Sequence, residues 1–164
     1  MSIKHYFSAL AFITFSLTSY AQDVWCKALK AIPQKIAKDE KAVVGKKVWG
    51  NEYYETFLSK ETISGSDSVR VKKFPDGGRL YQVVAFYCSK STDAQANAKY
   101  KELSGKLKSC FKNTVEMDHA YEAGYEKAHS YVGDGYIIRI VKYSASTYEL
   151  NKDQLTRVAV IIEY

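Results

Sequence analysis

Apolar residues recur at helical spacing near the start of the chain. They are separated by four, three and four positions, which places them on one face of a helix: Trp25, Leu29, Ile32 and Ile36. This pattern predicts a helix from Val24 to about Ala37, with Asp23 as its N-cap. Pro33 lies inside the pattern, and we expect it to kink the helix or to split off a last turn.

A second apolar stripe of the same kind lies in the middle of the chain. Its members recur at four, three, four and three positions: Ala96, Tyr100, Leu103, Leu107 and Cys110. Ser91 or Thr92 can cap a helix that begins at Asp93. Gly105 weakens such a helix by about 1 kcal/mol relative to alanine, which is too little to end it. We therefore predict a continuous helix over residues 93–110.

Strand patterns follow each helix. Residues 52–59, 66–74 and 79–88 follow the first one, and Pro75-Asp76-Gly77 between the last two predicts a tight hairpin turn. After the second helix, residues 125–132 and 136–144 flank a glycine turn and 156–164 form a last strand. Residues 79–88 and 156–164 are apolar on both sides, which is typical of central strands.

This order of elements, α-β-β-β-α-β-β-β, predicts an α+β fold. Consecutive antiparallel strands need only short connections, and two amphipathic helices need one sheet face to cover. We therefore expect two helices packed on one face of an antiparallel sheet of about five to six strands. The second half repeats the pattern of the first without a residue-level repeat, so internal duplication is a hypothesis.

The N-terminus has the pattern of a signal peptide. Lys4 and His5 precede an apolar run from Phe7 to Leu17, and Ser19-Tyr20-Ala21 offers a cleavage site before Gln22. The run is shorter than the roughly 20 apolar residues that a membrane span requires. We expect residues 1–21 to be removed and residues 22–164 to form a single secreted or periplasmic domain.

Composition adds two open questions about binding. The formal net charge is +6, and the lysines are spread along the chain, which fits a solvated surface or attraction to an anionic partner such as a polysaccharide, a lipid headgroup or an acidic protein. A nucleic acid partner is not expected for an exported chain. The 14 tyrosines fit packing at sheet edges, or stacking on sugars and anchoring of a protein partner.

Helix length decides how the three cysteines can pair. A helix over residues 93–110 spans roughly 25 Å, whereas bonded cysteines need Cα atoms within about 7 Å. Cys88 and Cys110 should therefore not pair. Antiparallel helices would bring Cys26, at the start of the first, to Cys110, so we predict that bond. Cys88 is then a buried, reduced thiol beside Val84 and Phe86, or alternatively a reactive or intermolecular one.

One segment, HAYEAGYEKAH, contains candidate metal ligands. On a helix, four of its side chains would share a face and could bind a metal: His119, Glu122, Glu126 and His129. On a strand, His119, Tyr121, Tyr125, Lys127 and His129 would share one side and the glutamates the other. Gly124 and the following turn favour the strand. We therefore predict no metal and no cofactor, and the chain contains no familiar catalytic motif.

The cysteine-bearing motifs carry a family resemblance. They are Trp25-Cys26-x-x-Leu29, Phe86-x-Cys88 and Tyr100-x-x-Leu103 followed by Cys110. In these the chain resembles small secreted bacterial α+β proteins of unknown function. Such proteins often have a further strand cysteine that could partner Cys88, and this sequence has none. The resemblance implies no activity.

Three functions are compatible with these patterns. The first is a non-enzymatic domain that binds an unidentified protein or an anionic or polysaccharide partner of the cell envelope. The second is a small extracellular hydrolase or metal-dependent enzyme that uses His119 and His129. The third is a chaperone-like or immunity-type protein, by analogy of fold alone. The first two differ in whether the histidines meet a carboxylate in a cleft.

Overall fold

A computed structural model describes most of the domain. The described residues are 24–75, 81–89, 91–111, 115–118, 125–133, 135–143 and 156–164. The expected signal peptide, the cap Asp23, the Asp76-Gly77 turn and His119 lie outside the described residues.

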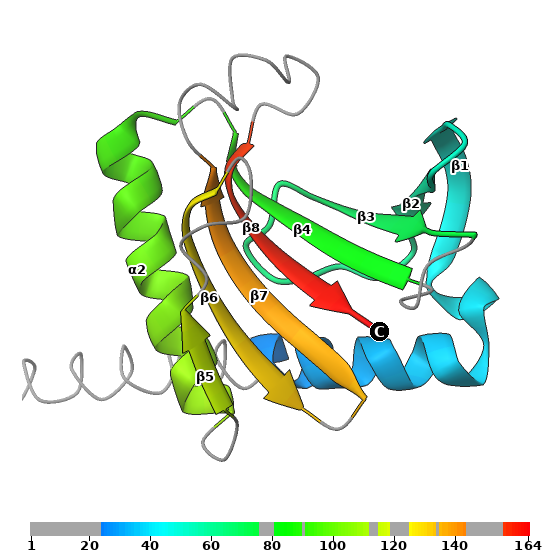
Figure 1. Ribbon diagram of the computed structural model, residues 1–164, viewed down its shortest axis with the longest axis horizontal. Coiled ribbons are helices and arrows are strands. Elements are labelled where there is room, and N and C mark those ends of the chain that lie inside the picture. The colour runs from blue at the N-terminus through cyan, green and yellow to red at the C-terminus, as the bar shows by residue number, and fades with distance from the viewer. Residues whose placement is uncertain are drawn as a thin grey trace, which may run out of the picture.

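Two helices and eight strands make up the described part (Figure 1). A helix over residues 24–38 is followed by a short 3-10 turn, η1 (Glu40–Ala42), and by β1 (Val44–Gly50), β2 (Glu55–Ser59), β3 (Ser68–Lys73) and β4 (Tyr81–Ser89). The second helix, α2 (Asp93–Cys110), leads to β5 (Val115–Asp118), β6 (Tyr125–Gly133), β7 (Tyr136–Tyr143) and β8 (Thr156–Glu163). The fold is α+β, as the sequence predicts.

The predicted number and order of strands are wrong. The described strands form one eight-stranded sheet in the order β1-β2-β3-β4-β8-β7-β6-β5, and every neighbouring pair is antiparallel. Each helix is followed by four strands rather than three. The two strands that the sequence pattern misses, β1 and β5, are the two edges of the sheet. Strand β1 has register shifts and five consecutive exposed residues, so alternation is lost there.

The order of strands divides the sheet into two equal halves. Each half is a helix followed by a four-stranded antiparallel meander, and the halves join where β4 pairs with β8. This repeated architecture supports the hypothesis of internal duplication at the level of the fold.

Both helices pack on the same face of the sheet. The first contributes its predicted stripe, and α2 contributes Ala96, Leu103 and Leu107, to one core with inward residues of the central strands. Trp25 also donates a hydrogen bond from Nε1 to the hydroxyl of Tyr87 on β4, at 3.1 Å. The helix continues past Pro33 to residue 38, because this packing stabilises it although proline removes one backbone hydrogen bond.

The opposite face has a smaller apolar cluster. It consists of Val84, Phe86, Ala128, Val141, Ala159 and Ile161. Beside this cluster, buried Glu163 accepts hydrogen bonds from Gln82 at 3.1 Å and from Arg139 at 3.4 Å. The buried charges of Glu163 and Arg139 are thus paired with each other, as the burial of charge requires.

The two helices meet at Cys26 and Cys110. Their sulfur atoms are 1.91 Å apart and their Cα atoms 5.5 Å apart, so the structure joins the pair that the sequence favours. The helices are not antiparallel neighbours, however. Figure 1 shows the first helix along the bottom of the sheet and α2 down its left side, so that they approach at a steep angle with these ends together.

Cys88 differs from the expected buried residue. It is only half-buried, and its φ of 60° lies in the left-handed region. Strand β4 ends one residue later, at Ser89, which still pairs with Thr156 of β8. The thiol is therefore at the end of a strand rather than inside the apolar cluster.

Candidate functional site

A groove between α2 and β6 is the candidate site. It has a volume of about 670 Å³, within the range of small-molecule sites. Its lining combines basic, aromatic and small polar side chains: Asn97, Tyr100, Lys101, Ser104, Gly105, Lys108, Lys127, His129 and Tyr131.

The helical repeat of α2 determines which of its residues form one wall of the groove. Thr92 and Gln95 form a reciprocal capping box that begins the helix. The buried stripe of Ala96, Leu103 and Leu107 then fixes the rotation of the helix on the sheet. The adjacent stripe, from Asn97 to Lys108, lies at the margin of the buried face and forms the wall.

The alternation of side chains along β6 determines which of its residues form the other wall of the groove. Lys127, His129 and Tyr131 alternate along the strand and face the helices, because Tyr131 belongs to the core beneath them. The Nε2 atom of His129 lies 3.1 Å from the hydroxyl of Tyr131. Residues 125–133 are thus extended, as predicted, whereas His119, Tyr121 and Glu122 lie outside the described residues.

One member of the predicted strand face lies elsewhere. The register shifts between Tyr125 and Lys127, so Tyr125 packs against Tyr143 on the other side of the sheet. The intervening Glu126 reaches Lys142 at 2.8 Å. The sequence pattern cannot locate this bulge, because an inserted residue reverses the alternation without changing composition.

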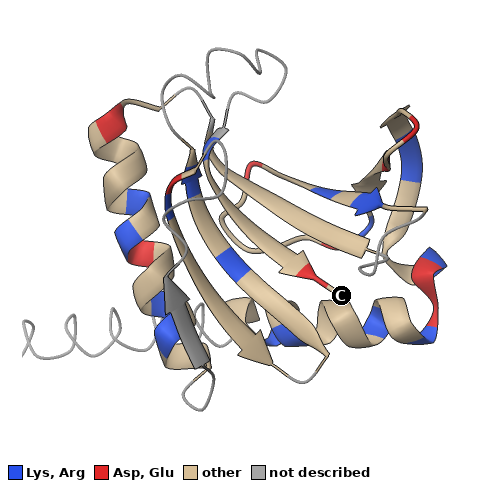
Figure 2. Ribbon diagram, in the orientation of Figure 1, with Lys and Arg blue, Asp and Glu red and all other residues tan. Residues whose placement is uncertain are grey.

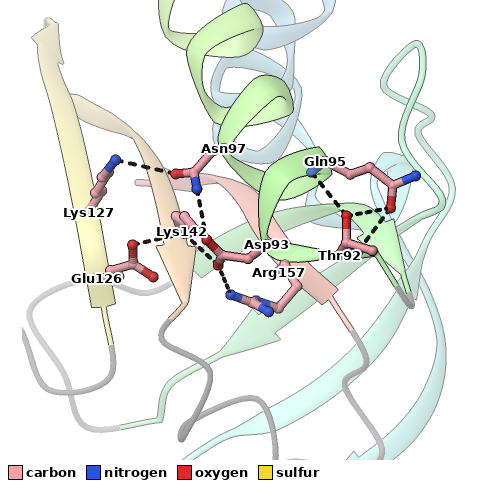
Figure 3. A network of polar contacts seen from close by, with 8 residues as sticks. All are labelled: Thr92, Asp93, Gln95, Asn97, Glu126, Lys127, Lys142 and Arg157. Atoms are coloured by element: carbon pink, nitrogen blue, oxygen red, sulfur yellow. Dashed lines mark hydrogen bonds and ion pairs between the residues drawn. The ribbon is translucent and has the colours of Figure 1, made fainter.

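Two buried cations attach the start of α2 to the sheet (Figure 3). Lys142 on β7 has no exposed side-chain surface, and Arg157 on β8 is nearly as buried. Both contact Oδ1 of Asp93, Lys142 at 2.9 Å. The hydrogen bond from Lys142 is the main reason why the pKa of Asp93 lies below its ordinary value, with Arg157 acting in the same direction.

The same network continues to the groove. Asn97 donates to Oδ2 of Asp93 at 2.9 Å, and its own Oδ1 accepts from Lys127 at 3.3 Å. Asn97 and Lys127 both line the groove. The two walls are therefore linked at one end, and their separation there is set by hydrogen bonds rather than by apolar packing alone.

The charge of the lining is positive. Three of the nine lining residues are lysines and none is acidic. Lys101 has no ion pair within the described ranges, and the contact described above for Lys127 is with a neutral amide. Of the two acids on α2, Asp93 is bound as described above and Glu102 is bound by Lys99 and Lys106. Burial would raise the pKa of Glu102, but these two hydrogen bonds outweigh it and lower that pKa.

The neighbouring edge strand carries acidic residues. Glu116 and Asp118 of β5 are in register with Tyr131 and His129 of β6. Among the nine lining residues, the lysines are Lys101 and Lys108 on the helical wall and Lys127 on β6. Figure 2 shows the basic positions spaced along α2, with acidic ones at its N-terminus and middle.

The structure does not bring the other sequence candidates into this groove. Burial raises the pKa of the Cys88 thiol, which favours the less reactive protonated form. Among the described residues, no three His, Cys, Asp or Glu side chains gather closely enough to hold a metal ion. His129 is the one candidate that lines the groove, and the position of His119 is outside the described residues.

The sequence indicates part of this site. Lysines off the apolar stripe of α2 are visible in the pattern, but nothing in the sequence pairs them with Lys127 and His129 on a distant strand.

In the described part of the chain, no helix is both long and apolar enough to cross a membrane. Compared with known proteins, the chain matches no family model, no curated protein and no solved structure.

Proposed function

We propose that the chain is an exported, non-enzymatic binding domain whose α2–β6 groove holds an anionic partner of the cell envelope. The observation that carries the proposal is the lining itself, with three lysines and no acid. Lysine ammonium groups in a groove attract anions, and the low-dielectric walls strengthen that attraction. The signal-like N-terminus supports a secreted or periplasmic location.

The shape of the site also supports binding. The capping box and the Asp93 network hold α2 at one end, and the Cys26–Cys110 pair holds it at the other. A groove between two fixed walls is preorganised, so a ligand orders few side chains when it binds.

The experiment compares two charge-reversal variants of residues 22–164. Lys101→Glu/Lys127→Glu changes the groove, and Lys38→Glu/Lys41→Glu makes the same change in charge at exposed positions away from it. Each is immobilised and exposed to envelope fractions. We expect the groove variant to capture at least about tenfold less of the specific partner and the control to match the unmodified domain. Equal capture by all three would refute the groove as the binding site.

The enzyme alternative has its own test. If His119 and His129 form a metal site, the purified domain should contain one tightly bound metal, and His119→Ala should lose it. We expect elemental analysis to find no stoichiometric zinc. One metal per chain that disappears in the variant would replace the binding proposal with the enzymatic one.

A further inference from the structure

We infer that the ligand of the α2–β6 groove is an acidic polysaccharide, a chain of sugars that carry carboxylates. This inference rests on the proposed function and names the class of anion. Two features support it, the spacing of the charges and the chemistry between them, and the open space at Gly105 provides an independent test.

The lysines are spread along the groove rather than convergent. Lys101 and Lys108 are two helical turns apart, a rise of about 10 Å, and Lys127 lies on the opposite wall. A compact phosphate prefers convergent donors or a helix N-terminus. The N-terminus of α2 is already capped, because Thr92 and Gln95 form a reciprocal capping box there. Separated cations instead fit a long anion with one charge on each repeating unit.

The groups between the lysines fit sugars better than a peptide. Both edges of β6 are paired, with β5 and β7, so a peptide cannot bind there as an added strand. The lining also lacks the aliphatic residues that an amphipathic helix requires. The amide of Asn97 has a second N–H besides the one that Asp93 accepts, and the half-buried ring of Tyr100 offers an apolar surface with a polar tip.

Gly105 lies at the centre of the helical wall. A Cβ atom added there would meet no other atom within 4 Å, so the space beside it belongs to the groove. A large side chain at this position can therefore fill the groove without a clash at its first atom and without any change of charge. This provides a steric test that is independent of the lysines.

The experiment measures binding of residues 22–164 by calorimetry to polygalacturonate, to dextran as a neutral polysaccharide, and to inorganic polyphosphate. We expect binding to polygalacturonate only. Lys101→Glu/Lys127→Glu and Gly105→Phe should each weaken it at least tenfold, and Lys38→Glu/Lys41→Glu, which lies away from the groove, should bind like the unmodified domain. Circular dichroism of each variant establishes that it is folded.

Other outcomes would overturn the inference. Absence of polygalacturonate binding, or binding that Gly105→Phe leaves unchanged, would mean that the groove does not hold a sugar chain. Tighter binding of polyphosphate than of polygalacturonate would show that the groove attracts negative charge and does not recognise sugars. If the groove variant still loses an envelope partner while polygalacturonate does not bind, the ligand class is wrong and the proposed function stands. If envelope capture is also unaffected, both fail.

Discussion

Removal of the Cys26–Cys110 bond should destabilise the domain strongly. The bonded cysteines are 84 residues apart in the sequence, so the bond closes about half of the chain into one loop. The loop-entropy relation gives a contribution of about 4.5 kcal/mol at 25 °C for a loop of this length. Because small domains are typically stable by only 5–15 kcal/mol, Cys26→Ala/Cys110→Ala should lose a large fraction of the free energy of unfolding.

Urea denaturation followed by circular dichroism measures this change. We expect the double variant and the reduced unmodified domain to unfold at similar, much lower urea concentrations than the oxidised domain. Cys88→Ala is the control, because it leaves the bond intact and removes only a half-buried sulfur. A loss below about 1 kcal/mol would refute the entropic argument. Non-reducing peptide mapping that finds Cys88 bonded to either partner would refute the pairing itself.

Three further predictions concern protons and processing. The lowered pKa of Asp93 stabilises the folded domain at pH values above 3.8, the ordinary pKa of this group, and this stabilisation is lost as the pH falls. Asp93→Asn should therefore make the free energy of unfolding, measured by denaturation, less dependent on pH in the acid range. Burial raises the pKa of Tyr87 to about 12. The contribution of its neutral hydroxyl to the stability of the fold is therefore complete below about pH 10 and is lost as the pH rises toward 12. Tyr87→Phe should remove that alkaline loss, at a cost of about 1–3 kcal/mol near neutral pH for the unpaired Trp25 donor. Intact-mass measurement of exported protein should find Gln22 at the N-terminus, and retention of Met1 would exclude cleavage.

The sequence predicts best where burial imposes a regular period. Both helices lie where their apolar stripes place them, and residues 79–88 and 156–164 include the central strands because they are apolar on both sides. The edge strands escape prediction for the opposite reason. Strand β1 exposes Lys46, Lys47, Val48 and Trp49 in succession, so no alternation marks it. Edge strands commonly carry such charges and bulges, which hinder unwanted pairing.

The candidate site is predictable only in part. The positions of Lys101 and Lys108 beside the buried stripe follow from helical period alone. Their proximity to Lys127 depends also on where α2 lies on the sheet, and its N-terminal end is attached by Asp93, which meets two cations from β7 and β8. Such a meeting joins residues about 50 and 64 positions apart, and no local pattern encodes it.

The central position of β8 has a consequence for the order in which the fold can assemble. Strand β8 pairs with β4 on one side and β7 on the other, yet it is the last of the described strands in sequence. A polypeptide that emerges N-terminus first therefore presents the other seven described strands before the one that joins the two halves of the sheet. Until residues 156–163 arrive, β1–β4 and β5–β7 have no shared hydrogen bonds in the native pattern. Completion of the sheet thus waits until β8 has been made or translocated, after the other seven described strands.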